Sequence, residues 1–221
     1  MSTFEFKTPV SDEDIRKVHA GDVIYLTGDI VTGRDDVHHR VVVSGKMPPI
    51  DLKGKAIFHA GPIMKKISDE GEPDKYKVIS VGPTTSMRME KAQAEFLAKT
   101  GVKVIIGKGG MGPKTTQGCI DNVAIHTIFP GGCAVVAAED IVDCEGVEWL
   151  DLGMPEAMWK LKAERFGPLI VSIDSYGNNL IENNKIDFNT RKEKALADLK
   201  GKLNFMDYDD VKTRSFIREI S

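Results

Sequence analysis

The sequence predicts a mixed α/β fold with two sheet layers, and three observations support this. Short apolar runs rich in valine and isoleucine alternate with stretches whose apolar residues recur at helical spacing. Gly-Pro pairs follow several of the apolar runs and mark the points where strands end. Many of the expected strands are short, and several connections between them resemble hairpins. These features argue against a regular doubly wound sheet.

The composition is that of an ordinary globular protein. A chain of 221 residues suffices for one large domain or two small ones. The net charge of −3, without a long basic run, argues against nucleic acid or an anionic membrane as the main partner. No apolar stretch is long enough to span a bilayer, and residues 1–7 show neither a signal core nor a transit pattern. A cytoplasmic location is therefore expected.

The first part of the chain is expected to hold a short helix and three strands. Ser11 begins the helix, with Asp14 at the capping-box position. The strands are predicted over residues 23–26, 56–60 and 76–81, where β-branched and aromatic residues gather. Two polar stretches lie between them. Residues 27–40 fit either a helical turn or a loop, and residues 68–75 fit a hairpin loop.

The second part is expected to alternate strands with helices. Strands are predicted over residues 102–106, 134–138 and 169–174, and helices over 115–125 and 156–166. The helix over 156–166 is inferred from the spacing of its apolar residues, which are Met158, Leu161 and Phe166.

The C-terminal region is polar. Thr190 and Glu193 form a capping box for a helix that is expected to end near Leu203. The predicted domain therefore covers residues 1–203. Residues 204–221 form a charged tail, either mobile or bound to a partner.

Three consecutive hydroxyl residues begin the central helix. Thr84, Thr85 and Ser86 follow a Gly-Pro pair at the end of a strand, and Arg88 lies in the first turn of a helix that should end at Gly101. The free N–H groups of a helix N-terminus favour an anion, and an arginine fork suits a carboxylate. The alternative is purely local: Thr85 or Ser86 caps the helix and Arg88 lies in solvent.

A second candidate anion site lies in the glycine-rich sequence of residues 107–110. Glycines such as Gly109 let the backbone approach a ligand, and Lys108 supplies a charge. The spacing of a nucleotide-binding loop is absent, so a small anion is the expected ligand, and a glycine-rich turn with a surface lysine is the alternative. Together with Arg34 and Arg88, Lys108 supplies the cations that a dicarboxylate requires.

Three further kinds of candidate residue are a threonine, a histidine and the cysteines. Thr84 is the hydroxyl nearest the Gly-Pro break, and it needs a neighbouring group to act as a base because its own pKa lies far above 7. His59 is the histidine best placed for a site, with a buried core histidine as the alternative. The cysteines, which are Cys119, Cys133 and Cys144, form no zinc pattern and are expected to be buried, inert thiols, so no metal is assigned to this chain.

Six stretches taken together resemble the β-subunit of iron–sulfur hydro-lyases, the family of class I fumarases and L(+)-tartrate dehydratases. The similarity extends from about Gly21 to Leu180, and G-P-T-T-S-x-R-M combined with K-G-G-M is highly specific. Residues 54–62 and 86–90 look closest to the tartrate dehydratase branch. The stretches are T-G-R-D at 32–35 with His38, F-H-A-G-P at 58–62, residues 82–90, residues 107–112, L-G-M-P-E at 152–156 and F-G-P at 166–168.

The resemblance implies a swivelling β/β/α three-layer domain with mixed sheets. This domain closes over a 4Fe–4S cluster that is bound by a partner α-subunit, in an assembly of α2β2 type. The family's base falls on Thr84, and its substrate-binding cations fall on Arg34, Arg88 and Lys108. The open iron of the cluster would bind the substrate hydroxyl and one carboxylate as a Lewis acid. Thr84 would remove a proton from the adjacent carbon.

The expected substrate is a C4 2-hydroxy-dicarboxylate, with L(+)-tartrate, dehydrated to oxaloacetate, as the first choice. Thr85, Gly109 and His59 complete the expected substrate-binding set. His59 stands where fumarases more often carry an aromatic residue, so it is the candidate partner of the additional tartrate hydroxyl. The alternatives are a class I fumarase β-subunit and a non-catalytic anion-binding subunit of the same fold.

Overall fold

The computed structural model describes residues 1–200 of the chain. The chain divides into two compact units, Met1–Ile181 and Glu182–Ser221. The first unit contains all the β-structure of the described residues, and the second begins within the helix α6 (Leu180–Lys200). The predicted tail over 204–221 lies outside the described residues. Within the described part of the chain, no helix is long and apolar enough to cross a membrane.

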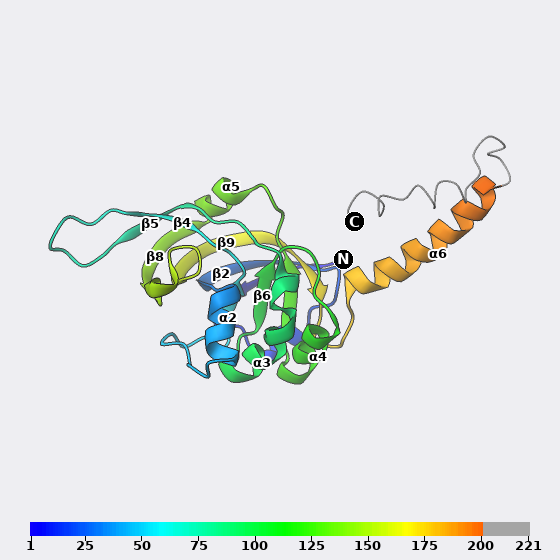
Figure 1. Ribbon diagram of the computed structural model, residues 1–221, viewed down its shortest axis with the longest axis horizontal. Coiled ribbons are helices and arrows are strands. Elements are labelled where there is room, and N and C mark those ends of the chain that lie inside the picture. The colour runs from blue at the N-terminus through cyan, green and yellow to red at the C-terminus, as the bar shows by residue number, and fades with distance from the viewer. Residues whose placement is uncertain (201–221) are drawn as a thin grey trace, which may run out of the picture. The chain divides into compact units, whose positions relative to one another are not determined.

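A seven-stranded mixed sheet forms the centre of the first unit (Figure 1). The order is β1 (Thr3–Lys7), β2 (Val23–Thr32), β3 (Ala56–Phe58), β6 (Val104–Gly107), β7 (Ile125–Ile128), β9 (Met158–Ile173) and β8 (Ile141–Glu148). The strands from β1 to β7 in this order are parallel, and the long β9 runs antiparallel to β2, β7 and β8. Because β9 pairs with both β2 and β7, the sheet closes on itself.

A separate antiparallel hairpin is formed by β4 (Ile63–Lys66) and β5 (Tyr76–Ser80). Its loop extends away from the sheet, as Figure 1 shows, and the predicted hairpin loop over 68–75 is confirmed. The mixed α/β class is likewise confirmed.

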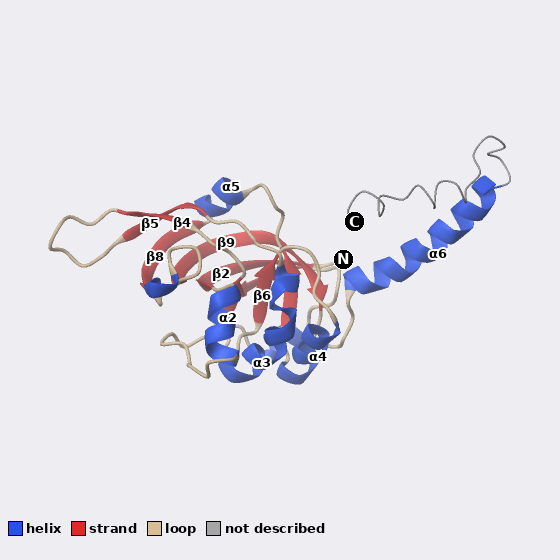
Figure 2. Cartoon of the chain, in the orientation of Figure 1, coloured by secondary structure: helices blue, strands red, loops and turns tan. Residues whose placement is uncertain are grey.

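The helices gather mainly on one side of the sheet (Figure 2). Their bounds are α1 (Asp12–Arg16), α2 (Asp35–Val42), α3 (Glu90–Thr100), α4 (Pro113–Asn122) and α5 (Ala134–Glu139), with short 3-10 helices η1 (Ser86–Met89) and η2 (Leu150–Leu152). Ser11 caps α1 and accepts a 3.1 Å hydrogen bond from the N–H of Asp14, as predicted. The helix α3 ends at Gly101, whose φ of 69° suits glycine.

Two apolar clusters lie on the two faces of the sheet. Successive strand residues alternate between them: Ile105 belongs to the cluster that includes α2, α3 and α4, whereas Val104 and Ile106 belong to the other. The second cluster also contains Ala137 of α5 and Val78 of β5. Both faces of the parallel strands are therefore buried, which explains their continuous apolar runs.

Two predicted elements are wrong in type. Residues 134–138 form the helix α5 instead of a strand, because an alanine-rich run suits a helix and an apolar run alone does not distinguish the two. Residues 156–166 contribute to the strand β9 instead of a helix. Leu161 and Ala163 are buried while Lys162 and Glu164 are exposed, so the true period is two.

Three boundaries also differ from the prediction. The helix over 115–125 ends at Asn122, and Val123 takes a left-handed φ of 49° before β7 begins. The C-terminal helix starts at Leu180, so Thr190 lies inside it and donates a hydrogen bond to the carbonyl of Ile186 instead of capping it. The ambiguous stretch 27–40 completes β2 and then forms most of α2.

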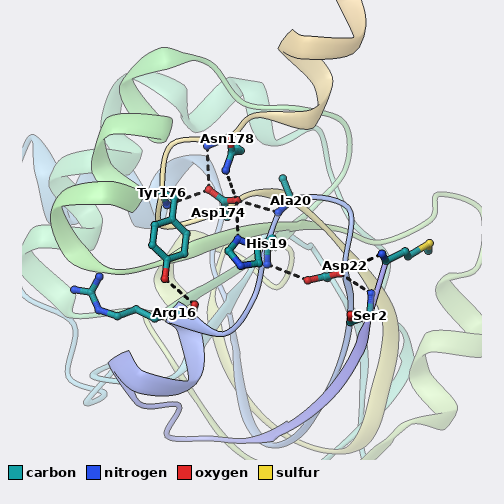
Figure 3. A network of polar contacts seen from close by, with 9 residues as sticks. Ser2, Arg16, His19, Ala20, Asp22, Asp174, Tyr176 and Asn178 are labelled. Atoms are coloured by element: carbon teal, nitrogen blue, oxygen red, sulfur yellow. Dashed lines mark hydrogen bonds and ion pairs between the residues drawn. The ribbon is translucent and has the colours of Figure 1, made fainter.

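A buried carboxylate joins the end of β9 to the turn before β2 (Figure 3). Asp174 is 0% exposed and accepts hydrogen bonds from the backbone N–H groups of Ala20 at 3.0 Å, Tyr176 at 3.0 Å and Asn178 at 2.9 Å. The side-chain amide of Asn178 donates a fourth, at 2.8 Å. Since β9 is antiparallel to β2, this cluster lies at the edge of the sheet where β2 begins, and we assign it a structural role.

We expect Asp174→Ala to destabilise the first unit strongly. The substitution leaves the partly buried N–H donors of Ala20, Tyr176 and Asn178 without their acceptor. A donor that stays buried and unpaired costs about 1–3 kcal/mol. Denaturant unfolding of the variant should show a clear fall in the free energy of unfolding, whereas Asp69→Ala in the exposed hairpin loop should change it little. Equal stability of the two variants would contradict the structural assignment.

Candidate active site

Four loops meet at one edge of the closed sheet. The strands β2, β3 and β6 are parallel neighbours, with Thr32 opposite Phe58 and Phe58 opposite Ile106. The carboxyl ends of parallel strands lie at the same edge, where α/β proteins commonly bind ligands. The loops that begin there carry Arg34 and His59, and the loop after β6 carries Lys108. The fourth loop, residues 81–85, arrives from β5.

The segment with the three hydroxyl residues lies against the end of β6. The N–H of Thr84 donates to the carbonyl of His59 at 2.6 Å, and the N–H of Lys108 donates to the carbonyl of Thr84 at 3.2 Å. The N–H of Ser86 in turn donates to the carbonyl of Lys108 at 3.0 Å. Thr85 and Lys108 are paired like residues of neighbouring parallel strands. Backbone hydrogen bonds thus bring together two segments that are far apart in the sequence.

The polar groups of these paired segments are accessible. Thr84 is half-buried, while Thr85 and Lys108 are exposed. Among the described residues, none forms a hydrogen bond or ion pair with the Thr84 hydroxyl or the Lys108 ammonium group. Gly109 has a φ of 75°, and a Cβ there would meet no atom within 4 Å. The open space and unpartnered groups suit a small anion.

The two arginines are held by carboxylates. Arg34 Nη2 lies 2.5 Å from Oε1 of Glu156, and Arg34 Nε lies 3.9 Å from Oδ2 of Asp35. Arg88 Nε donates to Oδ1 of Asp35 at 3.1 Å, and its Nη2 pairs with the other oxygen. Burial raises the pKa of Asp35, but the Arg88 hydrogen bond and charge outweigh it and lower that pKa overall. Asp35 therefore links the two arginines.

The prediction of Arg34, Arg88 and Lys108 as substrate-binding cations did not include these acid partners. Arg34 and Arg88 are paired, although Arg34 Nε is buried and has no hydrogen-bond partner among the described residues. The missed partners, Asp35 and Glu156, both occur inside motifs that the sequence displays. Adjacency to Arg34 was a usable signal for Asp35, whereas the contact with Glu156 depends on the path of the chain before β9.

His59 lies beneath this edge of the sheet, in the interior. The side chain is 0% exposed, with Nδ1 3.0 Å from Ser86 Oγ and Nε2 3.0 Å from the side-chain amide of Gln93. Burial lowers its pKa well below the ordinary value, and the nearby His38 and His126 reinforce the effect. With both ring nitrogens engaged, this geometry does not support direct contact with a substrate hydroxyl. It matches the alternative of a buried core histidine.

The local alternative for the hydroxyl residues is wrong for the helix cap, whereas its placement of Arg88 at the surface agrees with the exposed side chain. Thr85 occupies the N-cap position but makes no capping hydrogen bond with its side chain, and Ser86 Oγ faces His59. Arg88 is half-exposed yet bound to Asp35. These side chains therefore have roles other than capping the helix.

The glycine-rich loop ends at a helix N-terminus that already holds an anion. The carboxylate of Glu90 accepts hydrogen bonds from the N–H of Gly112 at 2.8 Å, Lys114 at 2.9 Å and Thr115 at 3.3 Å. The Thr115 hydroxyl adds another at 2.6 Å. Glu90 thus satisfies the first turn of α4, and a ligand anion would have to bind nearer to Lys108.

The three cysteines lie on separate elements. Cys119 is buried in α4, Cys133 precedes α5, and Cys144 lies in β8. Burial raises the pKa of Cys119 strongly, but Cys133 and Cys144 are only half-buried, so the expectation that they are buried is wrong. Within the described residues, no group of three or more histidine, cysteine or acidic side chains could hold a metal. The donor set described here does not fit an iron–sulfur cluster.

Comparison with known proteins identifies the class. Residues 2–184 match the family described as Fumarase C-terminus, so the chain belongs to that family. The resemblance to the iron–sulfur hydro-lyase β-subunits is thereby confirmed, and the chain is a subunit of a hydro-lyase enzyme.

Particular relatives narrow this class. The L(+)-tartrate dehydratase subunit beta of Escherichia coli K12 is 52% identical over 192 residues, which cover 87% of this chain and 93% of that subunit. A putative L(+)-tartrate dehydratase subunit beta of Methanocaldococcus jannaschii is 41% identical over 78% of this chain and 88% of its own. A putative fumarate hydratase class I of Geobacillus stearothermophilus is 39% identical over 80% of this chain, but only 33% of that protein is covered.

Proposed function

We propose that this chain is the β-subunit of an L(+)-tartrate dehydratase, which removes water from tartrate to give oxaloacetate. The observation that carries the proposal is the convergence of Thr84, Thr85 and Lys108 beside two carboxylate-held arginines at one edge of the sheet. Similarity to tartrate dehydratase β-subunits over most of the chain supports the choice of substrate.

In this proposal Thr84 is the base. Its hydroxyl removes the proton from the carbon next to the one that loses the hydroxyl group. An isolated threonine hydroxyl is too weak a base for this step. Since no described residue of this chain hydrogen-bonds to that hydroxyl, we assign its activation to groups of the α-subunit.

In this proposal the cationic side chains of this subunit bind one carboxylate of the substrate. Lys108 has no acidic partner among the described residues, so its charge is available to a substrate. Arg88 uses one edge of its guanidinium for Asp35, which fixes the plane of the fork before substrate arrives. Positive charge held in place stabilises the aci-carboxylate that develops when the proton leaves. Thr85 and the backbone at Gly109 complete the substrate-binding set.

The class I fumarase type is generally dependent on an iron–sulfur cofactor. We propose that a 4Fe–4S cluster is held by a partner α-subunit, since the donor groups described here do not fit one. The finer description of this chain as a swivelling β/β/α domain, in an α2β2-type cytoplasmic assembly, belongs to the same proposal. His59 enters it as a residue that acts through Ser86 instead of touching the substrate.

A class I fumarase β-subunit is the second candidate. The similarity to a putative fumarate hydratase class I favours it, and the same residues would serve there. Malate and tartrate differ at the carbon that loses the proton. A tartrate dehydratase should therefore prefer tartrate as its substrate, and a fumarase should prefer malate.

The proposal predicts that the isolated chain neither dehydrates C4 hydroxy-acids nor binds iron stoichiometrically. Activity should appear only when the chain is purified anaerobically together with a cluster-bearing α-subunit. Iron and sulfide analysis of both preparations, with a tartrate assay, measures this. Stoichiometric iron and sulfide in the isolated chain would overturn the assignment of the cluster to the partner.

A further inference from the structure

A continuous chain of buried hydrogen bonds connects two loops of the candidate site. His38 Nδ1 lies 2.8 Å from the backbone carbonyl of Arg34, and His38 Nε2 lies 3.0 Å from the side-chain amide of Gln93. The same amide atom is 3.0 Å from His59 Nε2, and His59 Nδ1 is 3.0 Å from Ser86 Oγ. The four side chains that form this hydrogen-bond chain, those of His38, Gln93, His59 and Ser86, are 0–1% exposed.

The hydrogen-bond chain begins at Arg34 and ends at Ser86, and both residues belong to segments of the candidate site. Arg34 caps α2 and carries one of the paired guanidinium groups, and its carbonyl is the fixed end of the hydrogen-bond chain. Ser86, at the other end, directly follows Thr85, and its N–H donates to the carbonyl of Lys108. The imidazole of His38 stacks on Phe96, with ring centroids 4.3 Å apart, so it has little freedom to turn.

Protonation of His38 follows from its partner. A carbonyl oxygen only accepts hydrogen bonds, so Nδ1 of His38 must carry a proton. Burial lowers the pKa of His38, although its contacts with Arg34 and Gln93 oppose this. A neutral ring with a protonated Nδ1 has a bare Nε2, which needs a donor from Gln93.

The orientation of the Gln93 amide follows from the same assignment of donors and acceptors. Oxygen and nitrogen of an amide are distinguished by the hydrogen bonds around them. The structure places Oε1 of Gln93 between the two imidazoles, where it faces the bare Nε2 of His38 without a proton between them. Turning the amide by 180° puts the NH2 group there instead, with one hydrogen for each Nε2 atom. The other amide atom of Gln93 is buried and has no partner among the described residues. A carbonyl oxygen tolerates that position better than an NH2 group, which would leave two donors unpaired.

We propose that Gln93 donates one hydrogen bond to each imidazole, which fixes His38 and His59 as Nδ1–H tautomers and makes His59 a donor to Ser86. Gln93, His38 and His59 are then positioning residues that hold the Arg34 loop and the Thr84–Ser86 segment in one arrangement. A purely accepting group at Gln93 would force a second proton onto His38 or break its bond to Arg34. The catalytic part of this inference rests on the proposed function, whereas the tautomers do not.

Nuclear magnetic resonance of the full chain, labelled with nitrogen-15 in histidine, tests the tautomers directly. We expect protonated Nδ1 and bare Nε2 for both His38 and His59, assigned with single-histidine variants. His39, exposed on α2, is the internal control and should show tautomers in exchange. A proton on Nε2 of either buried ring would overturn the proposal, regardless of whether the enzyme acts on tartrate.

A matched pair of variants tests the effect on catalysis in the two-chain enzyme. His59→Asn keeps a donor at the place of Nδ1, facing Ser86, whereas His59→Gln places its amide near the position of Nε2 and leaves Ser86 without that donor. Loss of the Ser86 hydrogen bond should lower kcat of His59→Gln about tenfold relative to His59→Asn. Melting temperatures of the two variants serve as the control for folding. Equal kcat at equal melting temperature would overturn the positioning role.

These outcomes separate the inference from the proposed function. If Thr84→Ala retains activity while the tautomers are as expected, the assigned reaction fails and the hydrogen-bond chain stands. If Thr84→Ala is inactive but Nε2 of His38 or His59 is protonated, the proposed reaction stands and the proposed tautomers are wrong.

Discussion

Thr84→Ala is expected to lower kcat of the two-chain enzyme by at least about 100-fold, the smallest loss typical for a general base. The fold should persist, because the structural contacts of Thr84 are made by its backbone: its N–H donates to His59 and its carbonyl accepts from Lys108. Alanine keeps both groups and removes only the hydroxyl. Steady-state kinetics of the anaerobically reconstituted enzyme measures the loss.

Two further variants define what this result means. Thr84→Ser keeps a hydroxyl at the same position and should retain more activity than the alanine variant. Thr190→Ala, on the exposed side of α6, is the matched control and should leave kcat unchanged. Near-normal turnover of Thr84→Ala would refute its role as the base, and Thr85, the adjacent exposed hydroxyl, would be the first alternative.

The second large effect concerns the substrate. The proposed enzyme should prefer L-tartrate over L-malate, since tartrate carries one additional hydroxyl on the carbon that loses the proton. A site that hydrogen-bonds this hydroxyl discriminates against the analogue without it, by up to about 10⁴-fold, because a buried polar partner is left unpaired. Comparison of kcat/KM for the two substrates measures the preference.

The buried position of His59 changes what is expected of a substitution at this residue. If His59 touched the hydroxyl directly, His59→Phe would shift preference toward malate without loss of stability. The buried contacts with Ser86 and Gln93 predict instead that His59→Phe impairs both substrates and lowers stability. A clear malate preference of the wild-type enzyme would overturn the tartrate assignment while leaving the hydro-lyase class unaffected.

Local patterns predicted elements well where one segment determines its own conformation. Ser11 with Asp14 marked the start of α1, and Gly101 marked the end of α3. The longest strand failed the same approach. The spacing of Met158 and Leu161 suggested a helix, but β9 pairs with three other strands, and such long-range pairing outweighs local preference.

Gln93 shows how a site residue escapes sequence reasoning. It falls on the buried face of α3, between Met89 and Phe96, and the apolar spacing from which this helix was predicted did not single it out. Spacing cannot show that two histidines from other elements meet its amide. Their meeting depends on how α2 and α3 pack against the end of β3.

The sequence by itself determined the family and the mixed α/β class, and it nominated Thr84, Arg34, Arg88 and Lys108 for the site, because short motifs at strand ends are local features that chemistry constrains directly. Only the tertiary structure decided how those residues are paired. Asp35 holds Arg88, Glu156 holds Arg34, and Glu90 fills the helix N-terminus next to the glycine-rich loop. These contacts join segments distant in sequence. They exist because β2, β3 and β6 run parallel and bring the loops at their carboxyl ends to one edge.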